Sequence, residues 1–167
     1  MKQGHSYQRL PNKRDHNCFG CSPTNPSGLQ MEFYADHARV VSWLTVPEHL
    51  CGWDRLVHGG VLSTILDEIM NWTALHFYKK FTLTKSMTVD FLKPAHIDKK
   101  FRAEAKPMQR NGRHEVLISG SLYDEDDQLC ARATATLMMV TPKVARRLGI
   151  MDSAEIETSA ALTGCQV

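Results

Sequence analysis

The stretch that most constrains the fold runs from Gly60 to about Tyr78, where apolar residues recur at steps of three and four. This spacing predicts an α-helix of about five turns. Apolar side chains cover most of its circumference, so several sides of the helix should be buried. No second stretch of similar length has this pattern, and the rest of the core must therefore come from strands.

Alternating and apolar runs predict strands on both sides of this helix. Two precede it and four follow it, at residues 28–36, 38–46, 85–95, 99–112, 113–128 and 129–141. The Asn111–Gly112 pair predicts a hairpin turn, and residues 142–149 favour a short helix. Because helices do not alternate with strands, this order predicts an α+β fold, in which an antiparallel sheet of about six strands wraps around one long central helix.

Composition indicates an ordinary globular protein. The chain has 167 residues, of which 43% are hydrophobic and 23% are charged. A net charge of +2 gives no reason to expect nucleic acid as a partner, and no apolar run is long enough to predict a membrane-spanning helix. Five cysteines, an odd number, argue against a disulfide framework and for a cytoplasmic location. We expect a flexible segment over residues 1–17, one domain over 18–150 and a frayed or weakly docked tail over 151–167.

The start of the predicted helix has features of an anion-binding site. Gly59 and Gly60 stand where loop becomes helix, and glycine lets a ligand approach the backbone closely. The first N–H groups of a helix lack internal partners and lie at the positive end of its dipole, which suits a carbonyl oxygen that gains negative charge. The alternative is that the glycines only permit a tight turn. His58 is a general base by residue type, or it shapes the loop.

A small polar side of the helix suggests a cleft or a subunit interface. Its members share one face at helical spacing: Gly60, Ser63, Thr64, Asp67, Met70, Asn71 and Ala74. A buried carboxylate such as that of Asp67 is costly unless it is paired or hydrogen-bonded. Asp67 lies about 12 Å along the axis from Gly59. It either faces a bound substrate or is a core residue whose hydrogen bonds are made within the fold. Glu68 points about 100° away from Asp67 around the helix and is the second candidate for the functional acid.

Cys18-Phe-Gly-Cys21 is a C-x-x-C motif that leaves three interpretations open. A structural zinc ion needs four ligands, of which this pair supplies two. A redox pair would usually lie at a strand-to-helix junction, and none is predicted here. Because residues 22–29 are typical of successive turns, we interpret the motif as a structural turn and predict neither a metal site nor a cofactor.

Two segments carry a resemblance to a known family. HGGVLSTILDE, residues 58–68, resembles the helix start of hotdog-fold acyl-CoA thioesterases of the phenylacetate-pathway, PaaI-like type. CFGCSPTNPSGL, residues 18–29, resembles an N-terminal segment of one bacterial branch. The resemblance covers about residues 17–141 and implies the hotdog fold. It also implies a hydrolase that cleaves an acyl or aryl coenzyme A thioester.

The resemblance implies roles for individual residues. The Gly59 N–H would bind the thioester oxygen, Asp67 would act as base or nucleophile, and a hydroxyl from Thr84 or Ser86 would place the water. The wider set of substrate contacts would be His58, Gly60, Ser63, Thr64, Met70, Asn71 and Ser86. The family implies a homodimer or homotetramer whose active sites take residues from two subunits. Candidates for the nucleotide phosphates, by charge alone, are Lys85, Lys93, Lys99, Lys100, Arg110 and Arg113.

Other functions are weighed against this hydrolase. A hotdog dehydratase would need a loop like His-Phe-Pro-Gly, which this chain lacks. The family often has an Asn or Gln before His-Gly-Gly, and residues 50–57 contain neither. That departure keeps open a non-catalytic acyl-CoA or lipid-binding module. Leu62, Met70 and Trp72 indicate a medium acyl or aryl group if the site is a pocket.

Overall fold

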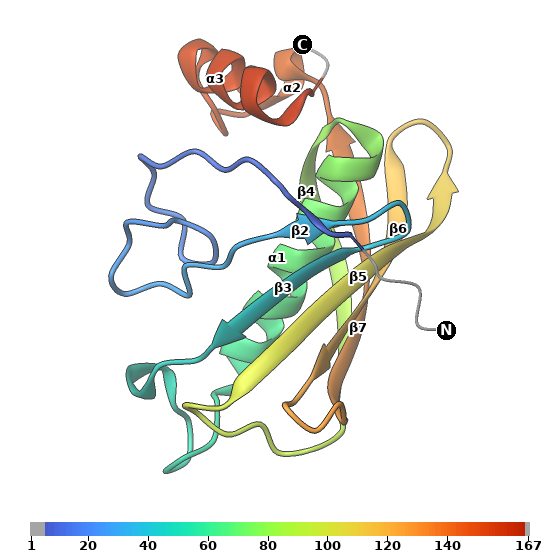
Figure 1. The fold of residues 1–167 in the computed structure, drawn as a ribbon. Coiled ribbons are helices and arrows are strands. Elements are labelled where there is room, and N and C mark those ends of the chain that lie inside the picture. The colour runs from blue at the N-terminus through green and yellow to red at the C-terminus, as the bar shows by residue number, and fades with distance from the viewer. Residues whose placement is uncertain (1–5, 166–167) are drawn as a thin grey trace.

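The computed structural model describes residues 6–165. Its central helix α1 (Gly59–Tyr78) lies across one face of a seven-stranded antiparallel sheet with the order β1-β2-β3-β5-β6-β7-β4 (Figure 1). The strands are β1 (Gln8–Arg9), β2 (Tyr34–Ala35), β3 (Val40–Thr45), β4 (Phe81–Phe91), β5 (Lys100–Asn111), β6 (Glu115–Tyr123) and β7 (Leu129–Val140). The predicted α+β arrangement, a hotdog fold with one long central helix, is confirmed.

Helix α1 is defined by caps at both ends and by burial along its length. The His58 side chain accepts a hydrogen bond from the Gly60 N–H at 2.9 Å, and Lys79 ends the helix in the left-handed conformation at φ 52°. Its four large apolar side chains without exposed surface are Ile65, Leu66, Ile69 and Met70. Burial of such side chains stabilises the fold by about 1.5–3 kcal/mol each. The sheet approaches closely at Gly120, where an added Cβ would lie 3.1 Å from Met70 Cγ.

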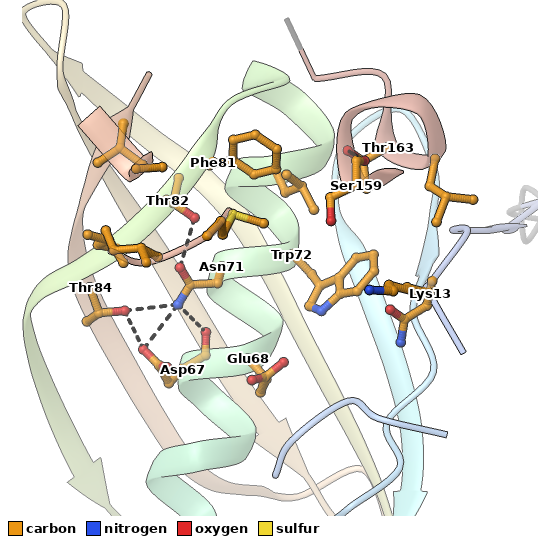
Figure 2. Close-up of a pocket in the computed structure, with 18 of the residues that line it drawn as sticks. Lys13, Asp67, Glu68, Asn71, Trp72, Phe81, Thr82, Thr84, Ser159 and Thr163 are labelled. Carbon is orange, nitrogen blue, oxygen red and sulfur yellow. Dashed lines mark hydrogen bonds between the residues drawn. The ribbon is translucent and has the colours of Figure 1, made fainter. Parts of the chain in front are cut away.

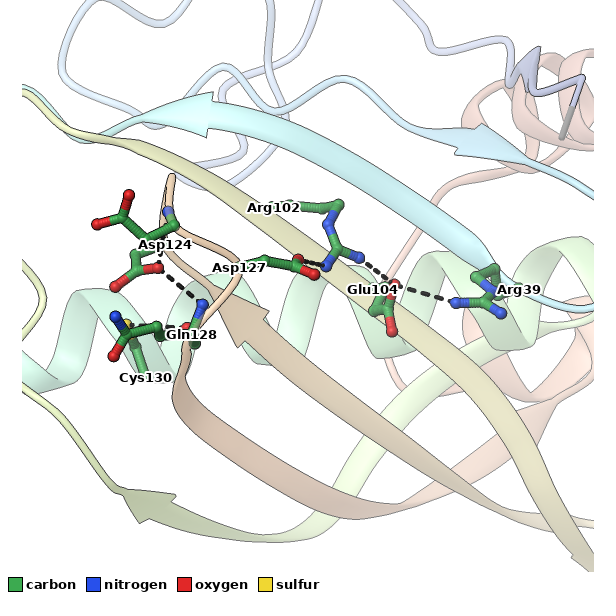
Figure 3. Close-up of polar contacts among 8 residues, drawn as sticks. Arg39, Arg102, Glu104, Asp124, Asp127, Gln128 and Cys130 are labelled. Carbon is green, nitrogen blue, oxygen red and sulfur yellow. Dashed lines mark hydrogen bonds and ion pairs between the residues drawn. The ribbon is translucent and has the colours of Figure 1, made fainter. Parts of the chain in front are cut away.

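The face of the sheet opposite α1 carries a connected set of ion pairs (Figure 3). Arg102 on β5 pairs with Glu104 at 2.6 Å and with Asp127 in the β6–β7 turn, and Arg39 pairs with Glu104 at 3.2 Å. Arg102 also lies over the Tyr123 ring, 4.4 Å from its centroid. An isolated exposed pair contributes only about 0.2–1 kcal/mol. Here the shared Arg102 and Glu104 link the residue before β3, strand β5 and the β6–β7 turn, which supports the register of these strands.

Strand β4 forms an edge of the sheet. It has 11 residues, starts four residues earlier than the sequence predicted, and within residues 6–165 pairs only with β7. The four side chains at positions 83–86 are exposed, and the pairing with β7 shifts between Thr84 and Ser86. A long strand with one unpaired side presents a row of backbone donors and acceptors to solvent or to another chain.

The predicted strand at residues 28–36 is mostly wrong. Only Tyr34 and Ala35 join the sheet, where they pair with β3. The preceding residues are bonded to the C-x-x-C turn instead: the Leu29 N–H donates to Phe19 O at 2.9 Å and the Met31 N–H to Gly20 O at 3.0 Å. Short β1 in the N-terminal segment was not predicted, and it pairs with β2.

The residues beyond the sheet form two helices. After α2 (Pro142–Arg147), helix α3 (Ser153–Thr163) begins at the cap Asp152 and ends at Gly164, whose φ is 71°. Its Ile156 and Ala160 are buried in a second small core with Phe81 and Val140. Figure 1 shows α2 and α3 gathered beyond one end of α1. Residues 1–5 and 166–167 of the segments expected to be loose lie outside the described residues.

Within residues 6–165, none of the helices is both long enough and apolar enough to cross a membrane.

Candidate functional site

Asp67, Asn71 and Thr84 form one hydrogen-bonded network between α1 and β4 (Figure 2). The Thr84 hydroxyl donates to Asp67 Oδ1 at 2.6 Å, and the Asn71 amide donates to Asp67 Oδ1 at 3.2 Å and to Thr84 Oγ1 at 2.9 Å. The Thr82 hydroxyl donates to Asn71 Oδ1 at 2.9 Å and so fixes the amide's orientation. No partner of Asp67 Oδ2 is recorded among the described residues. That oxygen remains available to water or substrate.

This network borders a cavity of about 510 Å³. Its walls come from α1, the first part of β4, residues 11–13 and the C-terminal helices. Most of the lining is apolar or aromatic, including Trp72, Phe81 and Leu162. Trp72 is held by stacking on Phe33, with ring centroids 4.5 Å apart. A cavity with an apolar lining and one ordered polar edge suits a ligand with an apolar part and a polar reacting group.

The helix start offers a free backbone donor, but not in this cavity. The Gly59 N–H has no partner recorded within residues 6–165, whereas the Gly60 N–H is taken by His58. A Cβ added at Gly59 would meet only Phe91, at 3.7 Å, so the approach to this N–H is open. Gly59 does not line the cavity that Asp67 lines. Within one chain the donor and the carboxylate are about 12 Å apart along the axis.

The other predicted site residues fall into different surroundings. The hydroxyls of Ser63 and Thr64 donate to the carbonyl oxygens of Gly59 and Gly60 at 3.0 Å, so they are engaged within α1. Met70 is fully buried and lies in the core rather than at the cavity. Ser86 is exposed on β4. His58 acts as the helix cap, through Nδ1.

Two residues near the site were missed by the sequence analysis. Thr82 lies two residues before Thr84, and the alternation of a strand would have placed the two on one face. Lys13 reaches the cavity from a segment expected to be flexible, where it pairs with Glu155 of α3. No sequence pattern links positions 13 and 155, so this contact could not have been predicted.

Glu68 points away from Asp67, toward the N-terminal loop. It accepts a hydrogen bond from Cys18 Sγ at 3.3 Å, and Cys21 lies beside both. Burial, together with the neighbouring Cys18 thiol, raises the pKa of Glu68 to about 8. A hydrogen bond from Cys21 lowers the pKa of Cys18, and the same bond raises the pKa of Cys21. The structure therefore separates the two adjacent acids of α1 into two environments.

Several of the basic candidates for phosphate binding are already engaged. Two are paired with carboxylates at 2.6 and 2.7 Å: Lys85 with Glu115 and Lys99 with Glu125. Arg110 and Arg113 line a second pocket beside the β5–β6 turn. These two remain the candidates with the more favourable placement.

Part of the sequence is similar to one protein family, and the fold is similar to several solved structures. The profile of the Thioesterase superfamily matches residues 55–131, which span α1, β4, β5 and β6 and reach into β7. The matched part, which is similar to this superfamily, makes up a little under half of the 167-residue chain. An uncharacterized protein of Schizosaccharomyces pombe is 30% identical over 90 residues, which is 51% of each chain. The match thus spans about half the length of this curated relative.

Solved structures of other proteins share the fold. The PaaI protein of the E. coli phenylacetic acid degradation operon is 18% identical, covers 68% of this chain and 81% of its own, and has a TM-score of 0.61. A hypothetical thioesterase of Streptococcus pneumoniae with coenzyme A is 18% identical, covers 66% and 85%, and also has a TM-score of 0.61. It was also solved with one Asp and with one Thr replaced by Ala. At these identities the likeness concerns the fold alone.

Proposed function

We propose that this protein hydrolyses an acyl or aryl coenzyme A thioester to the free acid and coenzyme A. The observation that carries the proposal is the Asp67–Asn71–Thr84 network at the edge of a largely apolar cavity. The coenzyme A held by the S. pneumoniae neighbour supports the substrate class. The Asp and Thr substitutions made in that neighbour concern the same two residue types.

In the proposed reaction Asp67 acts as general base. The bonds from Thr84 and Asn71 hold Oδ1, so Oδ2 accepts a proton from a water molecule. The water oxygen bonds to the thioester carbon, and the carbonyl oxygen becomes an oxyanion. The C–S bond then breaks, and the proton passes from Asp67 to the departing sulfur. A positioned base contributes about 10²–10⁴ in rate.

Direct attack by Asp67 is the other route, through a mixed anhydride. A single turnover in oxygen-labelled water distinguishes the two routes. Water attack puts the label in the product acid. Direct attack, followed by hydrolysis at the Asp67 carbonyl, puts it in Asp67.

The oxyanion donor is proposed to come from a second subunit. Gly59 has a free N–H at the positive end of α1, yet it lies outside the cavity of its own chain. The unpaired edge of β4 offers backbone groups to a second copy, which would bring another helix start toward Asp67. We therefore propose a homodimer, alone or within a tetramer, whose active sites are shared between subunits.

The cavity supports a substrate with an apolar acyl or aryl group of medium size. Its volume is about 510 Å³, and Trp72 and Phe81 provide flat apolar walls. Helix α3 closes one side through Leu162 and Thr163. Long chains would have to leave the cavity past this helix.

A hydrolysis screen over coenzyme A esters of different chain length tests the activity by release of the free thiol. We expect turnover for the wild-type chain and a loss of at least about 10²-fold in Asp67→Asn. Asp90→Asn is the matched control, because Asp90 is an exposed acid paired with Arg132, outside the network. Binding without hydrolysis of any ester would instead establish a non-catalytic acyl-CoA-binding module. Full activity in Asp67→Asn would remove the proposed base.

Complementation tests the shared site independently of the screen. Asp67→Asn and Gly59→Pro chains are co-expressed with different tags, and the mixed dimers are purified. Proline removes the N–H of residue 59, and it is tolerated at the first position of a helix. If each site combines Asp67 of one chain with Gly59 of the other, a mixed dimer has one intact site. It should then show about half the wild-type rate. A mixed dimer as inactive as its parents would place both residues in one chain's site.

A further inference from the structure

Three proton-releasing side chains converge between the N-terminal loop and α1, on the side of the helix away from Thr84. The donor atoms of Cys18, Cys21 and Glu68 all lie within 4.8 Å of one another, and Cys18 Sγ lies 3.3 Å from Glu68 Oε1. We refer to these three residues as the Cys18–Cys21–Glu68 cluster. The proposed hydrolysis makes no use of it.

Among the described residues, no Lys, Arg or His forms an ion pair with Glu68 of this cluster. Lys13, which lines the same cavity, is paired with Glu155. Cys21 is buried, and Cys18 and Glu68 are both partly buried. Buried groups that can become anions are costly unless a cation or hydrogen bonds compensate them. A bound cation would supply that compensation for all three.

We propose that Cys18, Cys21 and Glu68 bind one divalent, thiol-preferring metal ion of the zinc type, with water as its fourth ligand. Zinc binds Cys sulfur at about 2.3 Å and carboxylate oxygen at about 2.0–2.2 Å, so tetrahedral donors lie roughly 3.6–3.8 Å apart. The 3.3 Å contact and the 4.8 Å limit of the cluster bracket this spacing. Small side-chain rotations bring the donors to their places.

The backbone is shaped to bring the loop against the helix. Gly20 lies between the two cysteines, and a Cβ added there would lie 2.2 Å from Glu68 Cγ. Only glycine allows the turn to approach α1 this closely. The bonds that Leu29 and Met31 donate to Phe19 O and Gly20 O hold the turn in place. The ion would therefore tie residues 18–31 to α1, beside the cavity that Glu68 lines.

A Cys18–Cys21 disulfide is the competing chemistry for a C-x-x-C motif. Its formation requires an oxidant that takes two electrons from the thiols. It releases both thiol protons and leaves the Glu68 carboxyl without the Cys18 donor it now has. A metal ion uses all three side chains at once. The third member, contributed by α1 rather than by the loop, is what favours the metal over the disulfide.

Cobalt substitution tests the proposal on the complete 167-residue chain. The protein is purified under reducing conditions, stripped with a chelator and titrated with Co²⁺. We expect a sulfur-to-cobalt charge-transfer band that saturates at one equivalent and disappears when Zn²⁺ is added. No saturable band in the wild-type chain would overturn the proposal. Conversion of the stripped protein to a Cys18–Cys21 disulfide in the presence of Zn²⁺ would do the same.

Single substitutions then assign the ligands. Cys18→Ser and Cys21→Ser should each lose the band, and Glu68→Gln should weaken Co²⁺ binding by at least about tenfold. Cys51→Ser is the matched control, because Cys51 is an exposed thiol outside the cluster, and its band should equal that of the wild type. A band that survives in both Cys18→Ser and Cys21→Ser would refute the assignment. Asp67 is not a ligand, so this result is independent of the hydrolysis screen.

Discussion

Replacing Gly20 with alanine should destabilise the fold by about 1–3 kcal/mol, the usual range for an overpacked site. The added Cβ would lie 2.2 Å from Glu68 Cγ, 2.4 Å from Cδ and 2.7 Å from Oε1. Cγ is bonded directly to Glu68 Cβ, so it can move away only if the side chain changes rotamer or the loop shifts from α1. For a chain of this size, the cost corresponds to a fall in Tm of roughly 2–12 °C.

Thermal unfolding followed by circular dichroism, with a chelator present to exclude metal effects, measures this change. Gly59→Ala is the matched control, because a Cβ there meets only Phe91 at an ordinary 3.7 Å. Its Tm should stay level or rise slightly, since alanine favours a helix.

A double-mutant cycle isolates the contact between residues 20 and 68. Glu68→Ala removes all three atoms that the new Cβ would strike, so Gly20→Ala should cost less than about 1 kcal/mol in that background. If Gly20→Ala costs the same in both backgrounds, or nothing in either, the close packing of loop against helix is refuted.

Three further perturbations probe the proposed sites. Gly59→Pro removes the backbone N–H at the first helical position, where proline is tolerated, and should lower kcat by about 10²–10³, as for the loss of one oxyanion donor. Steady-state kinetics measure this, and an unchanged kcat would exclude the Gly59 N–H from that role. Thr84→Val removes the hydroxyl that donates to Asp67 at 2.6 Å and should lower kcat/KM about tenfold, equivalent to about 1.4 kcal/mol. An unchanged kcat/KM would show that this hydrogen bond does not contribute to the reaction. Zn²⁺ at 100 times its Kd should stabilise the stripped chain by about 2.7 kcal/mol, which raises Tm by roughly 5–11 °C. A Tm that does not change with Zn²⁺ would contradict the proposed metal site.

Helix α1 could be predicted to within one residue because its apolar pattern extends over five turns. The segment before β2 shows the limit of such patterns. Leu29, Met31 and Phe33 are all buried, as their alternation indicates. Alternation predicts an extended backbone with one buried face, but it carries no information about the hydrogen-bond partner, which here is a turn rather than a strand.

Asp67 and Glu68 of α1 also differ in how far their surroundings could be predicted from the sequence. The position of Asp67 beside Thr84 could be anticipated from family spacing, but its catalytic role stays a proposal. The contact of Glu68 with Cys18 joins residues 50 positions apart, and nothing in either local sequence encodes it. Residues 151–167 were expected to form a frayed or weakly docked tail because they are rich in Ala, Ser, Thr and Glu, and helix α3 lies within them. Ile156 and Ala160 dock it against Phe81 and Val140, which lie in distant strands.

The walls of the cavity come partly from the matched region and partly from segments outside it. Asp67, Asn71 and Thr84 lie inside the matched region of residues 55–131, whereas Lys13, Met151 and Leu162 lie outside it. Selection can therefore reshape the wall formed by the two flanking segments while the edge formed by Asp67, Asn71 and Thr84 stays constant. Relatives that share the superfamily core can differ in substrate preference without a single change among the residues by which they are recognised.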